Sequence, residues 1–453
     1  MRLLFSNCGE TSGPRVESAA PVTEVGGAAS PVGAAGATGA APGPITRGSV
    51  ARIGAATALS AVCVYAVMYL AARDLAPSGF AVLGVFWGAT GMVAGAANGL
   101  LQETTREIRA ARHRDVPPGP GESHTHPLRV AAMVGVAAAI VVAASSPLWS
   151  GWVFVEERWL SVVLLCVGLV GFGLHCTLLG MLAGTDQWTR YGALMVTDAA
   201  IRAAVAVATF ALGWGLAGFL WASVAGAVAW LIMLAVSPTA RATARLLTPG
   251  STVTFLRGTA HSITAAGANA ILVMGFPVLL RLTSTELGAQ GGVVILAVTL
   301  TRAPVLVPLM AMQGNLIAHF VDERTNRLRA LIGPSWVIGG IGAVGVLTAG
   351  VVGPWLLRVA FGTEYDASAA LLAWLTAGAV AIGMLTLTGA AVVAAALHRA
   401  YSLGWVGATA ASGLLLRLPL PLETRTVVAL LCGPLVGIGV HLVALARAGR
   451  LTR

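Results

Sequence analysis

The sequence predicts an all-α polytopic membrane protein of about 12 transmembrane helices in two six-helix bundles. Composition is the first observation: 57% of the 453 residues are apolar and only 10% are charged, against roughly 25% charged in soluble domains. The mean hydropathy is +0.83. A soluble chain this apolar could not cover its surface with polar groups, which excludes a soluble enzyme, a nucleic-acid-binding module and a secreted disulfide-rich domain.

The second observation is that long apolar runs recur at short intervals from Val50 onward. These runs do not alternate between apolar and polar residues, so they predict helices and not the strands of a β-barrel. We expect spans at residues 50–72, 79–100, 128–147, 159–182, 191–213, 216–236, 258–280, 290–312, 331–352, 368–394, 402–418 and 426–446.

The chain divides by composition into a tail, two halves and a connection. Residues 1–46 are rich in Ala, Gly and Pro and predict a disordered cytoplasmic tail. Residues 47–236 and 257–453 then form the N-terminal and C-terminal six-helix bundles, joined by a cytoplasmic linker at 237–256. Short sequence similarities between the halves indicate that one half arose by duplication of the other, with the two related by an axis along the membrane normal. Chance similarity between alanine-rich segments is the alternative.

The positions of the basic residues predict the orientation. All 28 are arginine, and most fall in loops on one side if the N-terminus is placed in the cytoplasm. The positive-inside rule therefore predicts that both termini are cytoplasmic.

The second predicted span carries a repeated small residue. Gly91, Gly95 and Gly99 form two overlapping G-x-x-x-G patterns, preceded by Gly84 and Gly88. Such a face permits close approach of another helix. Simple packing is one interpretation, and a surface that slides during a conformational change is the other.

Two charged residues lie four positions apart in the fifth predicted span. Asp198 and Arg202 share one helix face. Each alone would cost roughly 2.5–3.5 kcal/mol at the membrane centre on insertion scales, so a partner or a polar cavity is expected for both. The two side chains either satisfy each other or line such a cavity.

Arg302, near the middle of the eighth predicted span, has no acid in its own span. Pro304 and Pro308 follow it, and each removes a backbone donor, which predicts a loosened helix. We interpret Arg302 as an anion contact in a water-filled cavity, where a guanidinium can bind phosphate in a bidentate way. The alternatives are pairing with Asp198 across the bundle, or snorkelling to the interface.

Several common catalytic motifs do not occur in the sequence. We find no D-x-D, H-E-x-x-H, G-x-S-x-G or P-loop pattern, and His124 and His126 lack further ligands nearby. The five cysteines form no C-x-x-C pair and are interpreted as apolar packing residues. We therefore expect a protein that is not an enzyme, with no catalytic residues, cofactor or metal site.

Four local patterns carry a resemblance to a known family. These are "YLAARDLAPSGFAVLGVFWG", "GLLQETTREIRAA", "GMLAGTDQWTRYGALMVTDAAIRAAVAV" and "GPWLLRVAFGTEYDAS". Together with the predicted spans, they make the chain resemble the polysaccharide biosynthesis proteins and oligosaccharide flippases of the multidrug/oligosaccharidyl-lipid/polysaccharide (MOP) exporter superfamily.

The resemblance implies two bundles around a central cavity and a transporter that flips a polyprenyl-diphosphate-linked glycan by alternating access. Arg302 is the first candidate for contact with the diphosphate, Arg52 and Arg202 are weaker ones, and Asp198 lies beside Arg202. The resemblance further implies that the protein lies in a bacterial cytoplasmic membrane. Its expected partners are the lipid bilayer, the anionic lipid-linked glycan, and glycosyltransferases or a polymerase of the same pathway. No nucleic-acid partner is expected. The alternatives are a drug or cation antiporter and a non-transporting scaffold of a glycan assembly complex.

Overall fold

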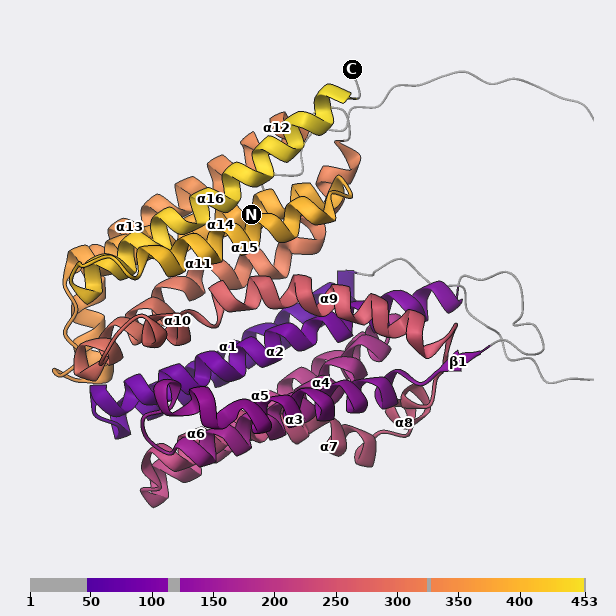
Figure 1. Ribbon diagram of the computed structural model, residues 1–453, viewed down its shortest axis with the longest axis horizontal. Helices are drawn as coiled ribbons and strands as arrows, with labels where there is room; N and C mark the ends of the chain where they lie inside the picture. Colours follow the sequence, from indigo (N-terminus) through magenta and orange to yellow (C-terminus); the bar gives the residue numbers. More distant parts are fainter. Residues whose placement is uncertain (1–46, 113–122, 324–326, 452–453) are drawn as a thin grey trace, which may run out of the picture. The chain divides into compact units, whose positions relative to one another are not determined.

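The protein is almost entirely helical in a computed structural model that describes residues 47–112, 123–323 and 327–451 (Figure 1). The tail predicted for residues 1–46 lies outside the described residues. The first half contains α1 (Arg47–Asp74), α2 (Pro77–Arg112), α3 (Pro127–Val153), α4 (Arg158–Gly184), α5 (Trp188–Leu212), α6 (Gly215–Ala225), the 3-10 turn η1 (Gly226–Val228) and α7 (Ala229–Val236).

The second half repeats the pattern of long antiparallel helices. It contains α9 (Thr252–Val273), α10 (Phe276–Leu282), α11 (Gly288–Asp322), α12 (Arg327–Ala330), α13 (Ile332–Phe361), α14 (Ala369–Ala394), α15 (His398–Leu415) and α16 (Leu422–Leu451). Between the halves lie α8 (Pro238–Ala244) and a two-residue strand, β2 (Thr248–Pro249), which pairs antiparallel with β1 (His124–Thr125). The segment predicted to be the linker, residues 237–256, therefore contains a short helix and a short strand.

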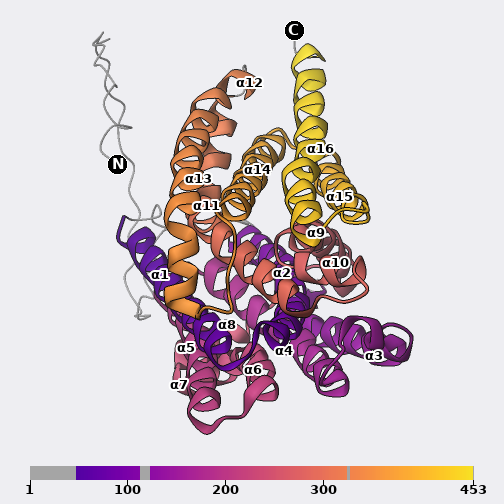
Figure 2. The ribbon, with the colours of Figure 1, turned by 90° about the vertical axis from the view of Figure 1, so that its left-hand side faces the viewer.

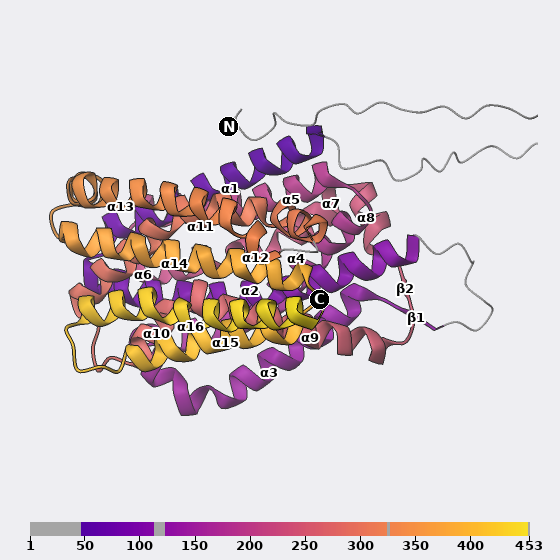
Figure 3. The same cartoon turned by 90° about the horizontal axis from the view of Figure 1, so that it is seen from above.

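The helices bear out a polytopic membrane protein. Within the described residues, ten helices are long and apolar enough to cross a membrane, and the bent pair of α9 and α10 makes an eleventh. The span predicted at 402–418 corresponds to α15, which runs beside α16 (Figure 3). An architecture of roughly twelve membrane helices is confirmed.

The span predicted at 258–280 is broken into two helices. The helix that contains Arg302 was predicted to be loosened by its prolines, but the interruption lies in this other span. α9 and α10 meet at an angle of 68°. Gly275 and Pro277 lie within one turn of each other there, and glycine weakens a helix while proline removes a backbone donor and clashes with the preceding turn. By contrast, α11 continues through Pro304 and Pro308 without interruption.

Helix α2 lies between the two halves. It packs along α4 of the first half, and along α9 and α11 of the second (Figure 2). Its glycine face supplies the close contact with the second half: a Cβ at Gly95 would overlap Ala270, and one at Gly99 would overlap the backbone of Ile263. The predicted close packing is confirmed, and its partner is the other half of the protein.

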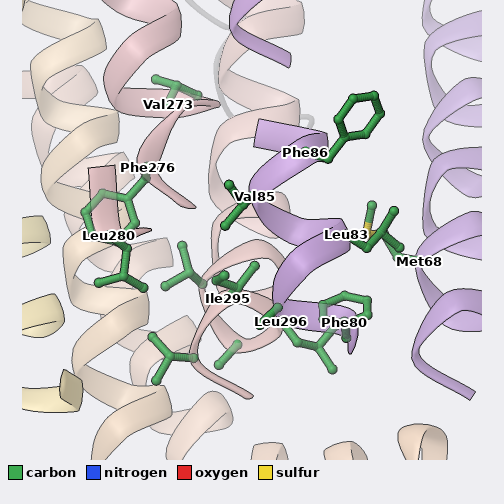
Figure 4. Packing of buried hydrophobic residues seen from close by; sticks show 14 of the residues in the cluster. Met68, Phe80, Leu83, Val85, Phe86, Val273, Phe276, Leu280, Ile295 and Leu296 are labelled. Carbon is green, nitrogen blue, oxygen red and sulfur yellow. The ribbon is translucent and has the colours of Figure 1, made fainter. Parts of the chain in front are cut away.

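Apolar side chains fill the contact between α2, α9, α10 and α11. Figure 4 shows Val85 of α2 near Ile295 of α11, with Phe276 and Leu280 of α10 alongside. All four are at most 2% exposed. The break between α9 and α10 is therefore packed against this buried core.

We call the end of the helices where α2 ends and α9 begins the arginine-rich end. Arg109 and Arg112 there form ion pairs of 3.2 and 2.8 Å with Asp186, in the turn after α4. These pairs join the end of α2 to the first half.

Candidate functional site

Arg302 lies against the break between α9 and α10. Its Nη1 donates a hydrogen bond of 2.8 Å to the carbonyl of Val273, and its guanidinium lies 5.1 Å from the ring centre of Phe276. The side chains of Val273 and Phe276 flank the break in Figure 4. Arg302 is 7% exposed, so its charge is held inside the protein and does not snorkel to the interface.

The hydrogen bond to Val273 compensates for a proline. In a continuous helix the carbonyl of Val273 would accept from the backbone N–H four residues later. That residue is Pro277, which has no N–H. Arg302 therefore supplies the donor that the broken helix lacks, which is one structural reason for an arginine at this position.

Two further donors of Arg302 have no partner in the described part of the protein. Nε and Nη2 are buried and make no hydrogen bond. These two nitrogens form one edge of the guanidinium, which is the geometry that binds a carboxylate or phosphate through two parallel hydrogen bonds. Leaving such donors buried and unpaired costs about 1–3 kcal/mol each. An anionic ligand at this edge would remove that cost.

Asp198 and Arg202 form an ion pair on α5. Their closest approach is 3.1 Å, and the side chains are 21% and 14% exposed respectively. Arg202 also donates to the carbonyl of Ser223 and lies 5.0 Å from the ring centre of Phe172. The interpretation that the two charges satisfy each other is therefore supported by the geometry.

The ion pair occupies a space that a glycine leaves open. A Cβ on Gly226 would overlap both Asp198 Oδ1 and Arg202 Nε. Gly226 begins η1, the 3-10 turn between α6 and α7. In both halves an arginine thus contacts an irregular turn within a membrane-crossing segment.

The predicted site residues are brought together only in part. Asp198 pairs with Arg202, and Arg302 donates to α9, so the interpretation of an Asp198–Arg302 pair across the bundle is wrong. Arg52 lies exposed near the start of α1, at the arginine-rich end. The structure therefore presents two separate charged sites, one in each half.

Glu103 is a buried acid that sequence reasoning missed. It is 2% exposed, pairs with Arg106 at 2.6 Å and accepts a hydrogen bond of 3.3 Å from Ser262 of α9. A Cβ on Gly258 would overlap its carboxylate. The available signal was its spacing: Glu103 follows Gly99 by four residues and continues the glycine face.

Within the described residues, no group of three or more His, Cys, Asp or Glu side chains is placed so that it could hold a metal ion. The groups that the two charged sites offer are guanidinium N–H donors and one carboxylate already paired with arginine. Such a set suits recognition of an anion by charge-assisted hydrogen bonds.

Comparison with known proteins gives close relatives in mycobacteria. The chain is 74% identical over 429 residues to the uncharacterized protein Rv3630 of Mycobacterium tuberculosis, covering 95% of this chain and 98% of the relative. It is 70% identical over 412 residues to the uncharacterized protein Rv1510 of the same species, covering 91% and 95%. No protein-family model matches the chain.

Solved structures place the fold. An inward-facing multidrug resistance MATE family transporter of the MOP superfamily matches with a TM-score of 0.67 and 15% identity, over 89% of this chain and 100% of that one. An outward-facing MATE transporter matches with a TM-score of 0.60 and 14% identity, over 89% and 96%. The chain therefore belongs to the same protein family as mycobacterial Rv3630 and Rv1510, and it has the fold of MATE transporters of the MOP superfamily.

Proposed function

We propose that this protein flips a polyprenyl-diphosphate-linked glycan across the bacterial cytoplasmic membrane, by alternating access of its two halves. The observation that carries the proposal is the unpaired Nε and Nη2 edge of Arg302, buried inside a transporter fold. A diphosphate supplies paired oxygens that match this edge. The resemblance of the sequence to oligosaccharide flippases supports the same cargo.

The covered position of Arg302 assigns a role to the break in α9 and α10. The guanidinium is held by Val273 and Phe276, on both sides of the 68° bend. Cargo contact therefore requires the break to move, and the short helix α10 can move with less disruption than a continuous span. Closure of the halves would follow along the glycine face of α2, which contacts α9 and α11.

Orientation and localisation form part of the proposal. We assign the arginine-rich end to the cytoplasm by the positive-inside rule, which places both termini there. On this assignment residues 47–236 and 257–453 act as two moving bundles, and residues 237–256 connect them on the cytoplasmic side. Enzymes that build or polymerise the glycan would be the partners on either side of the step.

The test is transport by the full chain in liposomes. A fluorescent polyprenyl-diphosphate glycan placed in one leaflet is followed by its accessibility to a membrane-impermeant quencher. We expect flipping by the native protein, loss with Arg302→Ala, and retention with Arg417→Ala, an exposed arginine outside the site. Normal flipping by Arg302→Ala at equal reconstituted levels would refute the assignment of Arg302.

A drug or cation antiporter is the second candidate, and two observations favour it. The solved neighbours include multidrug resistance transporters, and Glu103 is a buried carboxylate at the contact between the halves. Efflux of a lipophilic cation that is driven by a proton gradient and abolished by Glu103→Gln would support it. Asp198 and Glu103 are each paired with an arginine, but Glu103 also accepts a hydrogen bond from Ser262 of the second half.

A further inference from the structure

A shallow groove lies between α15 and α16 at the arginine-rich end, and Arg302 is not among its lining residues. The volume of this open groove is about 910 Å³. Its wall on α15 and the preceding turn is Ala396, Leu397, Arg399, Ala400 and Leu403, and its wall on α16 is Gly439, Val440, Val443, Ala444 and Arg447. Every lining residue is thus apolar or glycine except for two arginines.

The two arginines give the groove a positive mouth. Arg399 follows the start of α15, and Arg447 lies in the last turns of α16, so both lie at the same end of the helices. Both are exposed, and no acidic residue lines the groove. The ion pairs found in the described residues involve other arginines.

The backbone adds to this charge. The turn before α15 contains Ala396 in the left-handed region, with φ of 59°, and α15 begins at His398. The N-terminal end of an α-helix carries a partial positive charge and unpaired N–H groups. The start of α15 therefore lies beside Arg399 at the mouth of the groove.

The remainder of the groove suits a hydrocarbon chain. Leu403 is 62% exposed and Val443 is 51% exposed, an unfavourable state in water but a normal one against acyl chains. A Cβ at Gly439 would meet nothing within 4 Å, so this wall is open. An apolar cleft between membrane helices with arginines at one end is the pattern by which proteins bind anionic lipid headgroups.

We propose that the α15–α16 groove binds one anionic glycerophospholipid. Its phosphate lies between Arg399 and Arg447, and an acyl chain lies along Leu403, Gly439 and Val443. The ligand is a lipid of the surrounding leaflet and not the transported cargo. This inference goes beyond the proposed function and does not depend on it.

The experiment measures lipid binding to the delipidated full-length protein by native mass spectrometry. Phosphatidylglycerol is the probe, and phosphatidylcholine is the neutral comparison. We expect one tightly bound phosphatidylglycerol. Arg399→Ala with Arg447→Ala should weaken it by roughly 10- to 30-fold, as expected for removal of two arginines near an anionic lipid.

Two variants distinguish a site from general surface charge. Gly439→Phe fills the groove and keeps both arginines, so it should also lose the bound lipid. Arg129→Ala removes another exposed arginine at the same end and should bind normally. Thermal unfolding of each variant confirms that it is folded.

Three results would overturn the proposal. The first is an equal loss of phosphatidylglycerol binding in Arg129→Ala and in the double variant, which indicates general attraction of the anionic lipid to surface arginines. The second is unchanged binding in Gly439→Phe. The third is displacement of phosphatidylglycerol by a polyprenyl-diphosphate glycan at lower concentration, which would make the groove a cargo site.

Discussion

Arg302 Nη1 donates to the carbonyl of Val273 at the point where Pro277 leaves that carbonyl without its usual backbone donor. One guanidinium thereby both stabilises the end of α9 and keeps a second edge, Nε and Nη2, for another acceptor. The structural role and the proposed cargo contact of this arginine can be separated experimentally because they use different nitrogens.

A double-mutant cycle tests the structural role. Pro277→Ala restores a backbone N–H, so Val273 no longer depends on Arg302. We expect Arg302→Met to cost less stability in the Pro277→Ala background than in the native one, with a coupling of roughly 0.5–3 kcal/mol. Thermal unfolding in detergent provides the measurement. Additive effects of the two substitutions would show that the hydrogen bond does not compensate for the proline.

The cycle also predicts function. Arg302→Met should abolish cargo binding in both backgrounds, because the Nε and Nη2 edge is lost in each. Stability in the double variant together with absent binding would separate the two roles. Cargo binding that returns with stability would show that Arg302 only supports the fold.

Gly226 is predicted to be essential for the Asp198–Arg202 pair. A Cβ in Gly226→Ala would overlap both side chains and force the ion pair to shift. Overpacking of this kind costs about 1–3 kcal/mol. Gly340→Ala in α13 is the matched control, because a Cβ there meets nothing within 4 Å. Thermal unfolding should show a loss for Gly226→Ala and no loss for Gly340→Ala.

The approximate number and the places of the membrane helices could be predicted because burial in lipid requires about 20 apolar residues in sequence. Hydropathy does not report where such a run breaks. Gly275 and Pro277 lie inside an apolar segment, and only the pairing of the two within one turn distinguishes a broken span from a proline tolerated in a helix, as at Pro304.

The candidate site was predictable where it depends on local spacing. Asp198 and Arg202 are four residues apart, and helix geometry alone brings them together. The partner of Arg302 lies 29 residues away on another helix, and sequence spacing carries no information on that contact. Glu103 was missed because α2 continues as a helix to Arg112, beyond the apolar run that defined the span.

Gly99→Ala is predicted to separate the halves at the α2–α9 contact. The added Cβ would overlap the backbone of Ile263, which cannot rotate away as a side chain can. The distance between spin labels on α2 and α9, measured by electron paramagnetic resonance, should therefore increase, and its distribution should broaden. Gly54→Ala in α1 is the control, because a Cβ there meets nothing within 4 Å. An unchanged distance in Gly99→Ala would show that α2 does not limit the approach of the halves.

Tyr365, in the loop between α13 and α14, is predicted to make stability depend on alkaline pH. Its hydroxyl donates a hydrogen bond of 3.1 Å to the carbonyl of Leu75. Tyr365 is 2% exposed, and its ring contacts the ring of Phe80 edge to face. Burial, and secondarily the charge of Glu364, raise the pKa of Tyr365 above its ordinary value. The loop therefore holds the turn between α1 and α2 through a neutral phenol.

The direction in which stability changes with pH follows from the number of protons that the folded and unfolded states bind. The folded state keeps the proton of Tyr365 to higher pH than the unfolded state, in which tyrosine ionises near pH 10. Its contribution is complete below about pH 10 and declines as the pH rises above it, because the unfolded state then binds fewer protons. Tyr365→Phe should cost about 1 kcal/mol at neutral pH and should lose less stability than the native protein between pH 9 and pH 11. If the stabilities of the native protein and Tyr365→Phe fall equally over that pH range, Tyr365 is not the source of the pH dependence.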